Sequence, residues 1–304
     1  MDKTHPKYNE DYERLRGDAP AGDGMWEYFT CGDGAKLFVQ YWLPRDSGPE
    51  RVAVCFHGMC AHGMYYGMFA DELVPAGTAV YCADYRGHGL SDGDRGDVTD
   101  PMRVIEDMKA FILWVKERHP GAKIFTIGES MGGIINANLM MDPPCGIAGM
   151  VLCAPAIWFN MGGSPWKFAL LVPAGIIARI AFPGKKIIKT TGDEERGMKD
   201  PANLAYDKND PLHLAYVSPR YILSIFSLML RCRKSGSRDI KMPVLIFQGG
   251  KDIAVSAPAT REFYEKLEVE DKEMIYYPDA FHCMTTDPDA PGMLSRIREW
   301  MEAR

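Results

Sequence analysis

A short glycine-flanked segment near the middle of the chain carries the strongest chemical signal. GESMG (128–132) directly follows the apolar, strand-like run KIFTIG (123–128) and precedes a helical run. A serine in such a strand–turn–helix elbow projects its hydroxyl above the sheet, and the turn is so tight that glycine must flank it. The helix that begins there points its amides and positive dipole end at an oxyanion. The pattern predicts that Ser130 is a nucleophile, with Gly128 and Gly132 forming the elbow.

A nucleophilic serine needs a base and an orienting acid, and both follow in the expected chain order. Asp252 comes just after PVLIFQG (243–249), and His282 comes just after EMIYYP (273–278). We therefore expect Asp252 to hold the imidazole in the right tautomer and His282 to move the proton between Ser130 and the leaving group. Two acidic residues that neighbour the histidine are weaker alternatives for the acid: Asp279 and Asp287.

A second backbone donor for the oxyanion is expected from the loop that follows RVAVCF (51–56). The dipeptide His57-Gly58 opens this loop, and we assign the oxyanion hole to the amides of Met59 and Met131. His57 is expected to brace the loop by hydrogen bonding and is not the candidate base. Three residues of the later loop DYRGHGLSDG are expected to form a structural hydrogen-bond network: Arg86, His88 and Asp92.

Strand-like runs alternating with helical patterns must position these groups. Two runs around the turn signal CGDGA predict an antiparallel hairpin: MWEYFT (from Met25) and KLFVQYWL (from Lys36). Continuous apolar runs are typical of parallel strands covered by helices on both faces, and they occur at 51–56, 78–83, 123–128, 149–154 and 243–249. A last strand is expected at 273–278, followed by a closing helix. The alternation predicts an α/β fold with a mostly parallel, doubly wound sheet.

One interval, from about Trp158 to Asp239, breaks the alternation because it holds helical patterns, glycines and prolines but no strand-like run. An insertion between two sheet strands is expected to sit as a cap over the edge of the sheet. We therefore predict a catalytic core formed by residues 1–157 and 240–304, and a helical cap formed by residues 158–239.

Composition excludes several other classes of function. The apolar fraction of 46% and the charged fraction of 25% are ordinary for a soluble globular chain. A net charge of −6 supplies no basic face for nucleic acid. No metal-binding cysteine spacing and no secretory signal is visible, and the most apolar stretch, 166–182, is too short and too interrupted to span a membrane. The expected location is cytoplasmic, and no metal or organic cofactor is expected.

Together the motifs resemble the monoglyceride lipase group of α/β-hydrolases, also called lysophospholipases. The matching segments, in chain order across nearly the whole chain, are HGMCAH, DYRGHGLSDG, GESMGG, NDPL (209–212), PVLIFQGGKD and YPDAFH. The resemblance implies an α/β-hydrolase fold with a sheet of the eight-stranded type and a cap that forms a hydrophobic tunnel above the serine. It also implies the triad Ser130, Asp252 and His282 and the oxyanion pair Met59 and Met131.

Two positions depart from the group's pattern. Glu129 stands where the mammalian members usually have histidine, and Met59 stands where a smaller residue is common. The cap matches poorly beyond NDPL.

The predicted function is hydrolysis of carboxylic esters through an acyl-enzyme, with a monoacylglycerol or similar one-chain ester as substrate and glycerol and fatty acid as products. The apolar residues of the cap independently favour a lipophilic ligand, because they exceed what docking of a short insertion needs. We expect some to line an acyl pocket or to touch a membrane or micelle surface. The candidates for substrate contact are Trp158, Phe159, Ile177 and Ile180.

Three other functions remain open. One is a carboxylesterase or thioesterase of broader specificity. Another is an aminopeptidase of related fold, which needs carboxylates to hold the substrate ammonium, and the cap offers only Asp193, Glu194 and Glu195. The third belongs to a different class: a non-catalytic receptor with a hydrolase fold that binds a small apolar ligand. The oligomeric state is left open.

Overall fold

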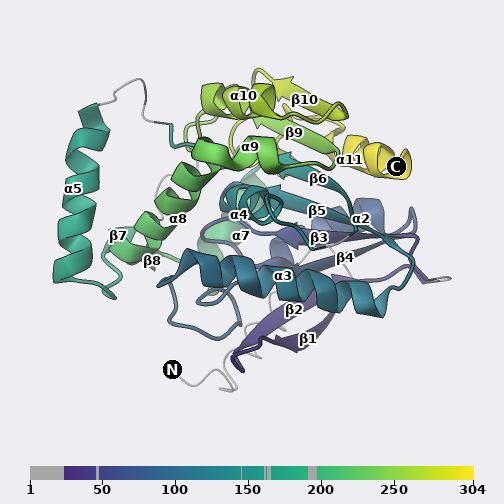
Figure 1. Ribbon diagram of the computed structural model, residues 1–304, viewed down its shortest axis with the longest axis horizontal. Helices are drawn as coiled ribbons and strands as arrows, with labels where there is room; N and C mark the ends of the chain where they lie inside the picture. Colours follow the sequence, from purple (N-terminus) through teal and green to yellow (C-terminus); the bar gives the residue numbers. More distant parts are fainter. Residues whose placement is uncertain (1–23, 46–47, 145, 161, 163–165, 191–196) are drawn as a thin grey trace.

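The computed structural model describes residues 24–45, 48–144, 146–160, 162, 166–190 and 197–304 (Figure 1). Within these residues the main sheet has eight strands in the order β1-β2-β4-β3-β5-β6-β9-β10. Their bounds are β1 Met25–Thr30, β2 Lys36–Trp42, β3 Arg51–Phe56, β4 Thr78–Ala83, β5 Lys123–Glu129, β6 Ile147–Cys153, β9 Val244–Gly249 and β10 Lys272–Tyr277. β1 and β2 form the predicted antiparallel hairpin, β2 runs antiparallel to β4, and the other neighbours pair in parallel.

Helices cover both faces of this sheet, as the continuous apolar strands predict. Their bounds are α2 Gly67–Leu73, α3 Pro101–Arg118, α4 Met131–Leu139, α10 Ala257–Lys266 and α11 Met293–Glu302, with short helical turns η1 Gly63–Tyr66 and η3 Met284–Thr286. α3 and α4 lie on the near face in Figure 1, whereas α2 and α11 pack together on the far face. α3 shows why the pattern works, because its apolar residues recur on one side and are buried there, while Asp100 caps its first turn through Met102 N at 2.9 Å.

The interval between β6 and β9 contributes no strand to the main sheet. It contains α5 Trp166–Ala181, α7 Pro201–Asn209, α8 Pro219–Arg231, the π-helical turn η2 Cys232–Gly236 and α9 Ser237–Asp239. α5 projects from the body at the left of Figure 1 and lies against α8. The expectation that this interval has no strand is wrong in one detail, because Ile188–Lys189 (β7) and Tyr216–Val217 (β8) pair as a separate two-stranded ribbon.

This ribbon escaped the sequence pattern because two residues per strand are too few to show a period. The start of α8 is as the sequence indicates: Ser218 Oγ accepts a hydrogen bond from Tyr221 N at 3.1 Å, and Pro219 takes the first helical position. None of the helices in the described ranges has the length and apolar character needed to cross a membrane.

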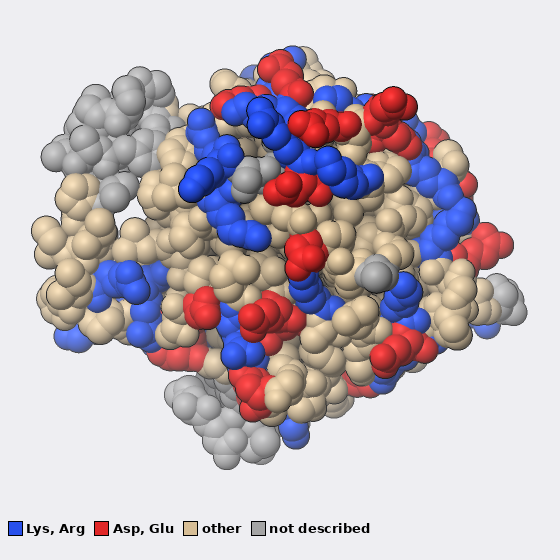
Figure 2. Space-filling model, viewed as in Figure 1, with Lys and Arg blue, Asp and Glu red and all other residues tan. Residues whose placement is uncertain are grey.

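Acidic and basic side chains are interspersed over the face seen in Figure 2. Lys and Arg gather over α8, α9 and α10. Several of them are paired there with the carboxylates of Glu262 and Glu268, among them Arg233, Lys266 and Lys241. The basic cluster is therefore largely compensated by neighbouring acids.

Candidate active site

The elbow between β5 and α4 holds Ser130 in a strained backbone conformation, with φ of 53° and ψ of −116°. Such a positive φ is unusual for a residue with a side chain, and it turns the hydroxyl out of the strand direction. A side chain at Gly132 would overlap the carbonyl oxygen of Phe56, and a Cβ at Gly128 would lie 2.6 Å from the carbonyl oxygen of Gly132. Glycine at both positions is therefore required, because α4 packs directly on the ends of β3 and β5.

His282 bridges the two other residues that the sequence singled out. Its Nε2 lies 2.9 Å from Ser130 Oγ, and its Nδ1 lies 2.8 Å from Asp252 Oδ2. Asp252 is buried, so its charge is little screened by water. This is the geometry in which a carboxylate fixes the imidazole tautomer and the opposite ring nitrogen takes the proton of the serine.

The loop after β9 holds Asp252 in place. Its Oδ1 accepts hydrogen bonds from the amides of Ala254 at 2.8 Å and Val255 at 2.9 Å, which leaves Oδ2 to His282. Gln248 Nε2 lies 3.3 Å from the same Oδ2. Neither alternative acid takes this place, because Asp279 pairs with Lys251 and Asp287 accepts hydrogen bonds from the backbone of its own loop.

The glycine pair that precedes Asp252 lets the histidine loop approach. A Cβ at Gly249 would lie 2.5 Å from the carbonyl oxygen of Phe281, and one at Gly250 would collide with the carbonyl oxygen of Pro278. Both glycines therefore allow the backbone after β10 to lie directly on the backbone after β9. This close packing sets the distance between Asp252 and His282.

The electrostatics of His282 follow from its two carboxylate neighbours. Burial by itself lowers the pKa of His282, but the charge and hydrogen bond of Asp252, with a further contribution from Glu129, outweigh it, so the pKa of His282 is raised above its usual 6.5. A higher pKa makes the imidazole a stronger base for the serine proton.

The amides of Met59 and Met131 are available at the expected place. Met131 is the first residue of α4, so its N–H has no partner inside the helix, and in the described ranges neither amide is taken by another acceptor. The loop that carries Met59 passes close to the nucleophile: a Cβ built at Gly58 would lie 3.9 Å from Ser130 Cβ.

His57 braces this loop as expected. Its Nε2 accepts a hydrogen bond from Tyr85 N at 3.1 Å, so Nδ1 carries the proton and donates to Gly58 O at 2.8 Å. Gly58 O belongs to the same peptide group as the amide of Met59, so this bond fixes the direction of that N–H. Burial first, and then His88, lower the pKa of His57 well below its usual value, so the ring stays neutral and keeps this pattern.

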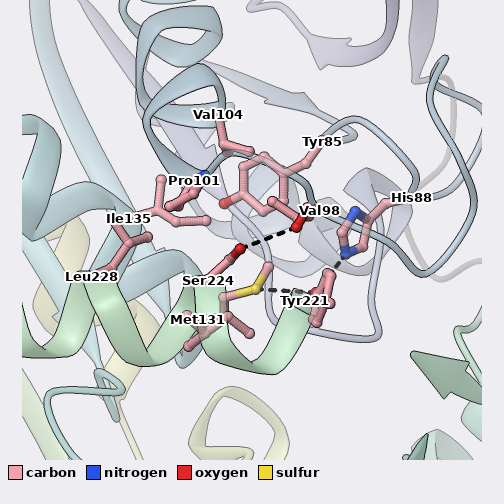
Figure 3. Close-up of a pocket in the computed structure, with 11 residues that line it drawn as sticks. Tyr85, His88, Val98, Pro101, Val104, Met131, Ile135, Tyr221, Ser224 and Leu228 are labelled. Carbon is pink, nitrogen blue, oxygen red and sulfur yellow. Dashed lines mark hydrogen bonds between the residues drawn. The ribbon is translucent and has the colours of Figure 1, made fainter. Parts of the chain in front are cut away.

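A residue that the sequence did not single out supports both predicted oxyanion residues. The hydroxyl of Tyr221, on α8, lies 2.8 Å from His88 Nε2 and 3.2 Å from Met131 Sδ (Figure 3). It also lies 2.8 Å from Met59 O. The apolar cavity beside this cluster is about 20 Å³, roughly the space of one water molecule, so it does not take a substrate. The inserted interval thus contacts the loop after β3 that carries Met59, here called the oxyanion loop, through the buried hydroxyl of Tyr221.

A second contact joins the insertion to the same loop. Asp210, in NDPL, accepts hydrogen bonds from His62 Nε2 at 2.7 Å and from Tyr65 OH at 2.9 Å. Burial raises the pKa of Asp210, but the charge and hydrogen bond of His62 outweigh it, so the net direction is downward. Leu214 N donates to Cys60 O at 3.1 Å. These bonds hold the segment of the insertion that precedes α8 on the loop that carries Met59.

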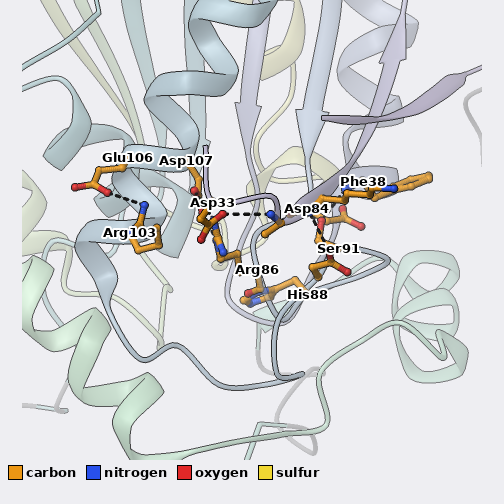
Figure 4. A network of polar contacts seen from close by, with 12 residues as sticks. Asp33, Phe38, Asp84, Arg86, His88, Ser91, Arg103, Glu106 and Asp107 are labelled. Carbon is orange, nitrogen blue, oxygen red and sulfur yellow. Dashed lines mark hydrogen bonds and ion pairs between the residues drawn. The ribbon is translucent and has the colours of Figure 1, made fainter. Parts of the chain in front are cut away.

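The loop DYRGHGLSDG divides between a structural network and the site. Arg86 forms ion pairs with Asp33 and Asp107, and Ser91 Oγ bonds Asp84 O and Phe38 N (Figure 4). All three residues that were expected to form a structural network make such bonds: Arg86 through these ion pairs, Asp92 by accepting from Lys36 N at 2.8 Å, and His88 through Nδ1, which lies 3.0 Å from Arg86 O. His88 Nε2 also lies 3.0 Å from Met59 O. The network therefore anchors the loop, and His88 contacts the oxyanion loop directly.

The candidates for substrate contact fall into two groups. Trp158 and Phe159 are partly buried, with Trp158 packed against Phe226. Ile177 and Ile180 lie on the outer side of α5 and are 66% and 77% exposed. None of these four residues lines the small apolar cavity beside Tyr221.

Two polar residues that the sequence reasoning missed hold the acid loop. Gln248 faces Asp252 from inside β9, and Asn160 Nδ2 donates to Asp252 O at 2.7 Å. A lone glutamine in an otherwise apolar buried strand was the available signal for Gln248. Nothing local marks Asn160. In the described ranges no cluster of three or more His, Cys, Asp or Glu side chains is arranged to hold a metal ion.

The sheet order, the elbow and the hydrogen-bonded serine, histidine and aspartate define the class of the protein as an α/β-hydrolase. The family model described as serine aminopeptidase, S33, matches residues 47–289, and the chain belongs to this family.

Known relatives confirm the resemblance to the monoglyceride lipase group. The chain is 27% identical to a monoacylglycerol lipase of Mycolicibacterium smegmatis over 273 residues, which covers 90% of this chain and 95% of the relative. It superposes on a monoacylglycerol lipase from Paleococcus ferrophilus with a TM-score of 0.74 and 28% identity, covering 88% and 98% of the two chains. A monoglyceride lipase of Saccharomyces cerevisiae shares the fold, with a TM-score of 0.82, 23% identity and coverage of 94% and 96%.

Proposed function

We propose that the chain is a carboxylic ester hydrolase that works through an acyl-enzyme on Ser130. The observation that carries the proposal is the imidazole of His282, which lies within hydrogen-bonding distance of both Ser130 Oγ and Asp252 Oδ2. Asp252 keeps the proton on Nδ1, so Nε2 is free to take the proton of the serine.

The geometry supports a two-step reaction. Ser130 Oγ attacks the ester carbonyl while His282 takes its proton, and the oxyanion rests on the amides of Met59 and Met131. His282 then protonates the leaving alcohol, and a water molecule repeats the sequence on the acyl-enzyme. Both amides belong to backbone that is already fixed, one by the start of α4 and one by His57, so little reorganisation is needed at the moment of reaction.

We propose a monoacylglycerol or a similar one-chain ester as the substrate. The names of the relatives from M. smegmatis and P. ferrophilus support this substrate class. We further propose that residues 158–239 form the cap over a catalytic core of 1–157 and 240–304, with Trp158 and Phe159 near the acyl chain. This division follows the interval between β6 and β9 that stays outside the main sheet.

The outer side of α5 suggests how a lipophilic ester is reached. Large apolar side chains are exposed from the second half of α5 to the start of β7: Ile176, Ile177, Ile180, Phe182 and Ile187. Basic residues lie among them, including Arg179, Lys185 and Lys189, and the described part of this projection is largely free of acidic side chains in Figure 2. We propose that this side of α5 makes transient contact with a membrane or micelle surface.

Substitution on α5 tests the membrane contact. Ile177→Asp with Ile180→Asp is expected to reduce co-sedimentation with phosphatidylcholine vesicles and to slow hydrolysis of vesicle-borne monooleoylglycerol. The rate on a soluble p-nitrophenyl ester should not change. Leu113→Asp, at an exposed leucine of α3, is the matched control. Equal loss on both substrates would contradict the proposed contact.

Fatty-acid release from monooleoyl-, dioleoyl- and trioleoylglycerol, beside a short p-nitrophenyl ester, tests the function itself. Turnover of monooleoylglycerol that disappears in Ser130→Ala supports both the serine mechanism and the substrate class. Turnover of the short ester alone keeps the mechanism and favours a broader carboxylesterase or thioesterase. Absence of serine-dependent turnover, with slow labelling by a fluorophosphonate probe, favours the receptor.

The family description also names aminopeptidases, so an aminoacyl amide belongs in the same assay. The three cap carboxylates that the sequence offers for a substrate ammonium, Asp193, Glu194 and Glu195, lie outside the described residues. Release of amine from an aminoacyl nitroanilide at a rate above that on monooleoylglycerol would reverse the proposed substrate class.

A further inference from the structure

Glu129 is an acidic side chain beside the nucleophile that the triad and the oxyanion hole do not use. It is the last residue of β5 and immediately precedes Ser130. Its Oε2 lies 3.4 Å from Tyr66 OH, and its Oε1 lies 3.4 Å from Thr285 Oγ1. Thr285 belongs to η3, three residues after His282, so Glu129 touches the loop that carries the base.

Both hydrogen bonds to Glu129 are long, so they stabilise its carboxylate only weakly. The hydroxyl proton of Tyr66 has a better acceptor in Phe56 O, at 2.9 Å. The side chain of Glu129 is partly buried, and among the described residues no lysine or arginine forms an ion pair with it. A carboxylate that is partly withdrawn from water is stabilised by a nearby cation or by several strong donors.

His282 is the cation that the geometry brings to this carboxylate, since its Nε2 lies 2.9 Å from Oγ of the adjacent Ser130 and its loop contacts Glu129 through Thr285. The pKa of Glu129 is raised, chiefly by burial, and the strongest opposing influence is the positive charge of His282, ahead of Thr285 and Tyr66. In return, Glu129 is the second carboxylate, after Asp252, that raises the pKa of His282. The other titratable groups around Glu129 come from three elements, Cys55 of β3, Tyr66 of η1 and Cys153 of β6, and burial raises the pKa of each, so they stay neutral.

We propose that Glu129 is a positioning residue whose carboxylate, packed between the elbow and the loop of His282, stabilises the imidazolium that forms when Ser130 gives up its proton. The imidazolium then lies between two anions, Asp252 hydrogen-bonded to Nδ1 and Glu129 acting through space. The proposal rests on the proposed function, since it assigns a role within the step that His282 catalyses.

The direct test reads the charge of His282 without any turnover. In a Ser130→Ala background, NMR titration of the ring protons of His282 gives its pKa with glutamate, glutamine or aspartate at position 129. Glu129→Gln keeps the shape and removes the charge, so the pKa of His282 is expected to fall by about one pH unit. Glu129→Asp keeps the charge and should recover at least half of that fall. Glu265→Gln, at an exposed position of α10, is the matched control and should leave the pKa unchanged.

Kinetics with serine at position 130 give the second measurement. Glu129→Gln should move the acid limb of kcat/KM on a soluble ester to lower pH and reduce the plateau about three- to tenfold. An unchanged pKa of His282 in Glu129→Gln overturns the proposal, and so does an equal fall in Glu129→Asp. Failure of the proposed function is recognised separately, because the wild type would then show no ester turnover that Ser130→Ala abolishes, whatever the NMR titration shows.

Discussion

Removal of the Tyr221 hydroxyl from α8 should weaken catalysis at the oxyanion hole, which is formed by the loop after β3 and the start of α4. In Tyr221→Phe the ring still fills its buried space, but Met59 O, His88 Nε2 and Met131 Sδ each lose the phenol as a partner. Met59 O keeps His88 Nε2 at 3.0 Å, so it is not left wholly unsatisfied. One or two buried hydrogen bonds lost, with partial compensation, correspond to about 1–2 kcal/mol of unfolding free energy.

The expected effect on kcat depends on the backbone at Met59, which loses the hydrogen bond from Tyr221. Met59 N–H is the proposed oxyanion donor, and loss of a whole donor costs about 10²–10³ in kcat. Tyr221→Phe only loosens the backbone that carries this donor, so we expect kcat on a short p-nitrophenyl ester to fall about tenfold with little change in KM.

Denaturant unfolding and steady-state kinetics measure the two effects on one protein. Tyr264→Phe is the control, because the hydroxyl of Tyr264, on α10, makes only a 3.5 Å contact with Lys272 O of β10. It should change neither quantity appreciably. A Tyr221→Phe protein that loses stability while kcat stays at the wild-type value would refute the link between α8 and the oxyanion hole.

Three further perturbations test the site. In Asp252→Asn the two amides that bind Oδ1 hold the new carbonyl oxygen, so the NH₂ faces His282 and forces the wrong tautomer; kcat should fall by about three to four orders of magnitude. Because the pKa of His282 is raised in the folded protein, kcat/KM should fall as the pH drops through a value above 6.5. The stability that the folded protein gains from the protonated ring should be present below pH 6.5 and should be lost as the pH rises through the folded pKa. Unfolding free energies of wild type and His282→Gln at pH 6 and pH 8 measure this, and a larger difference at pH 8 would contradict the assigned direction. Gly132→Ala should give little folded protein by circular dichroism because its Cβ would overlap Phe56 O, whereas Gly32→Ala, where nothing lies within 4 Å, should fold normally.

Much of the site could be predicted from local sequence because its residues lie at the ends of continuous apolar strands. The runs that end at Phe56, Gly128 and Gly249 are strands in the structure, and parallel strands must place the following loops at one edge. The elbow glycines were equally predictable, since the turn geometry alone excludes side chains there.

Other features arise only when distant segments meet. Tyr221 reads as an ordinary residue of an amphipathic helix, yet the fold brings its hydroxyl to Met59, 162 positions away in the chain. Asp210 contacts His62 across 148 positions, and β7 pairs with β8 although neither is long enough to show a pattern.

Glu129 depends both on what the sequence determines and on what only the tertiary structure decides. The amino-acid sequence by itself places a carboxylate next to the nucleophile, because adjacency in the chain is a covalent fact. Only the tertiary structure decides that this carboxylate is partly buried, contacts Tyr66 and Thr285, and acts on His282, which lies 153 positions further along the chain. Its effect depends on burial and on the distance between charges, and both are set by how the loops after β5 and β10 pack together.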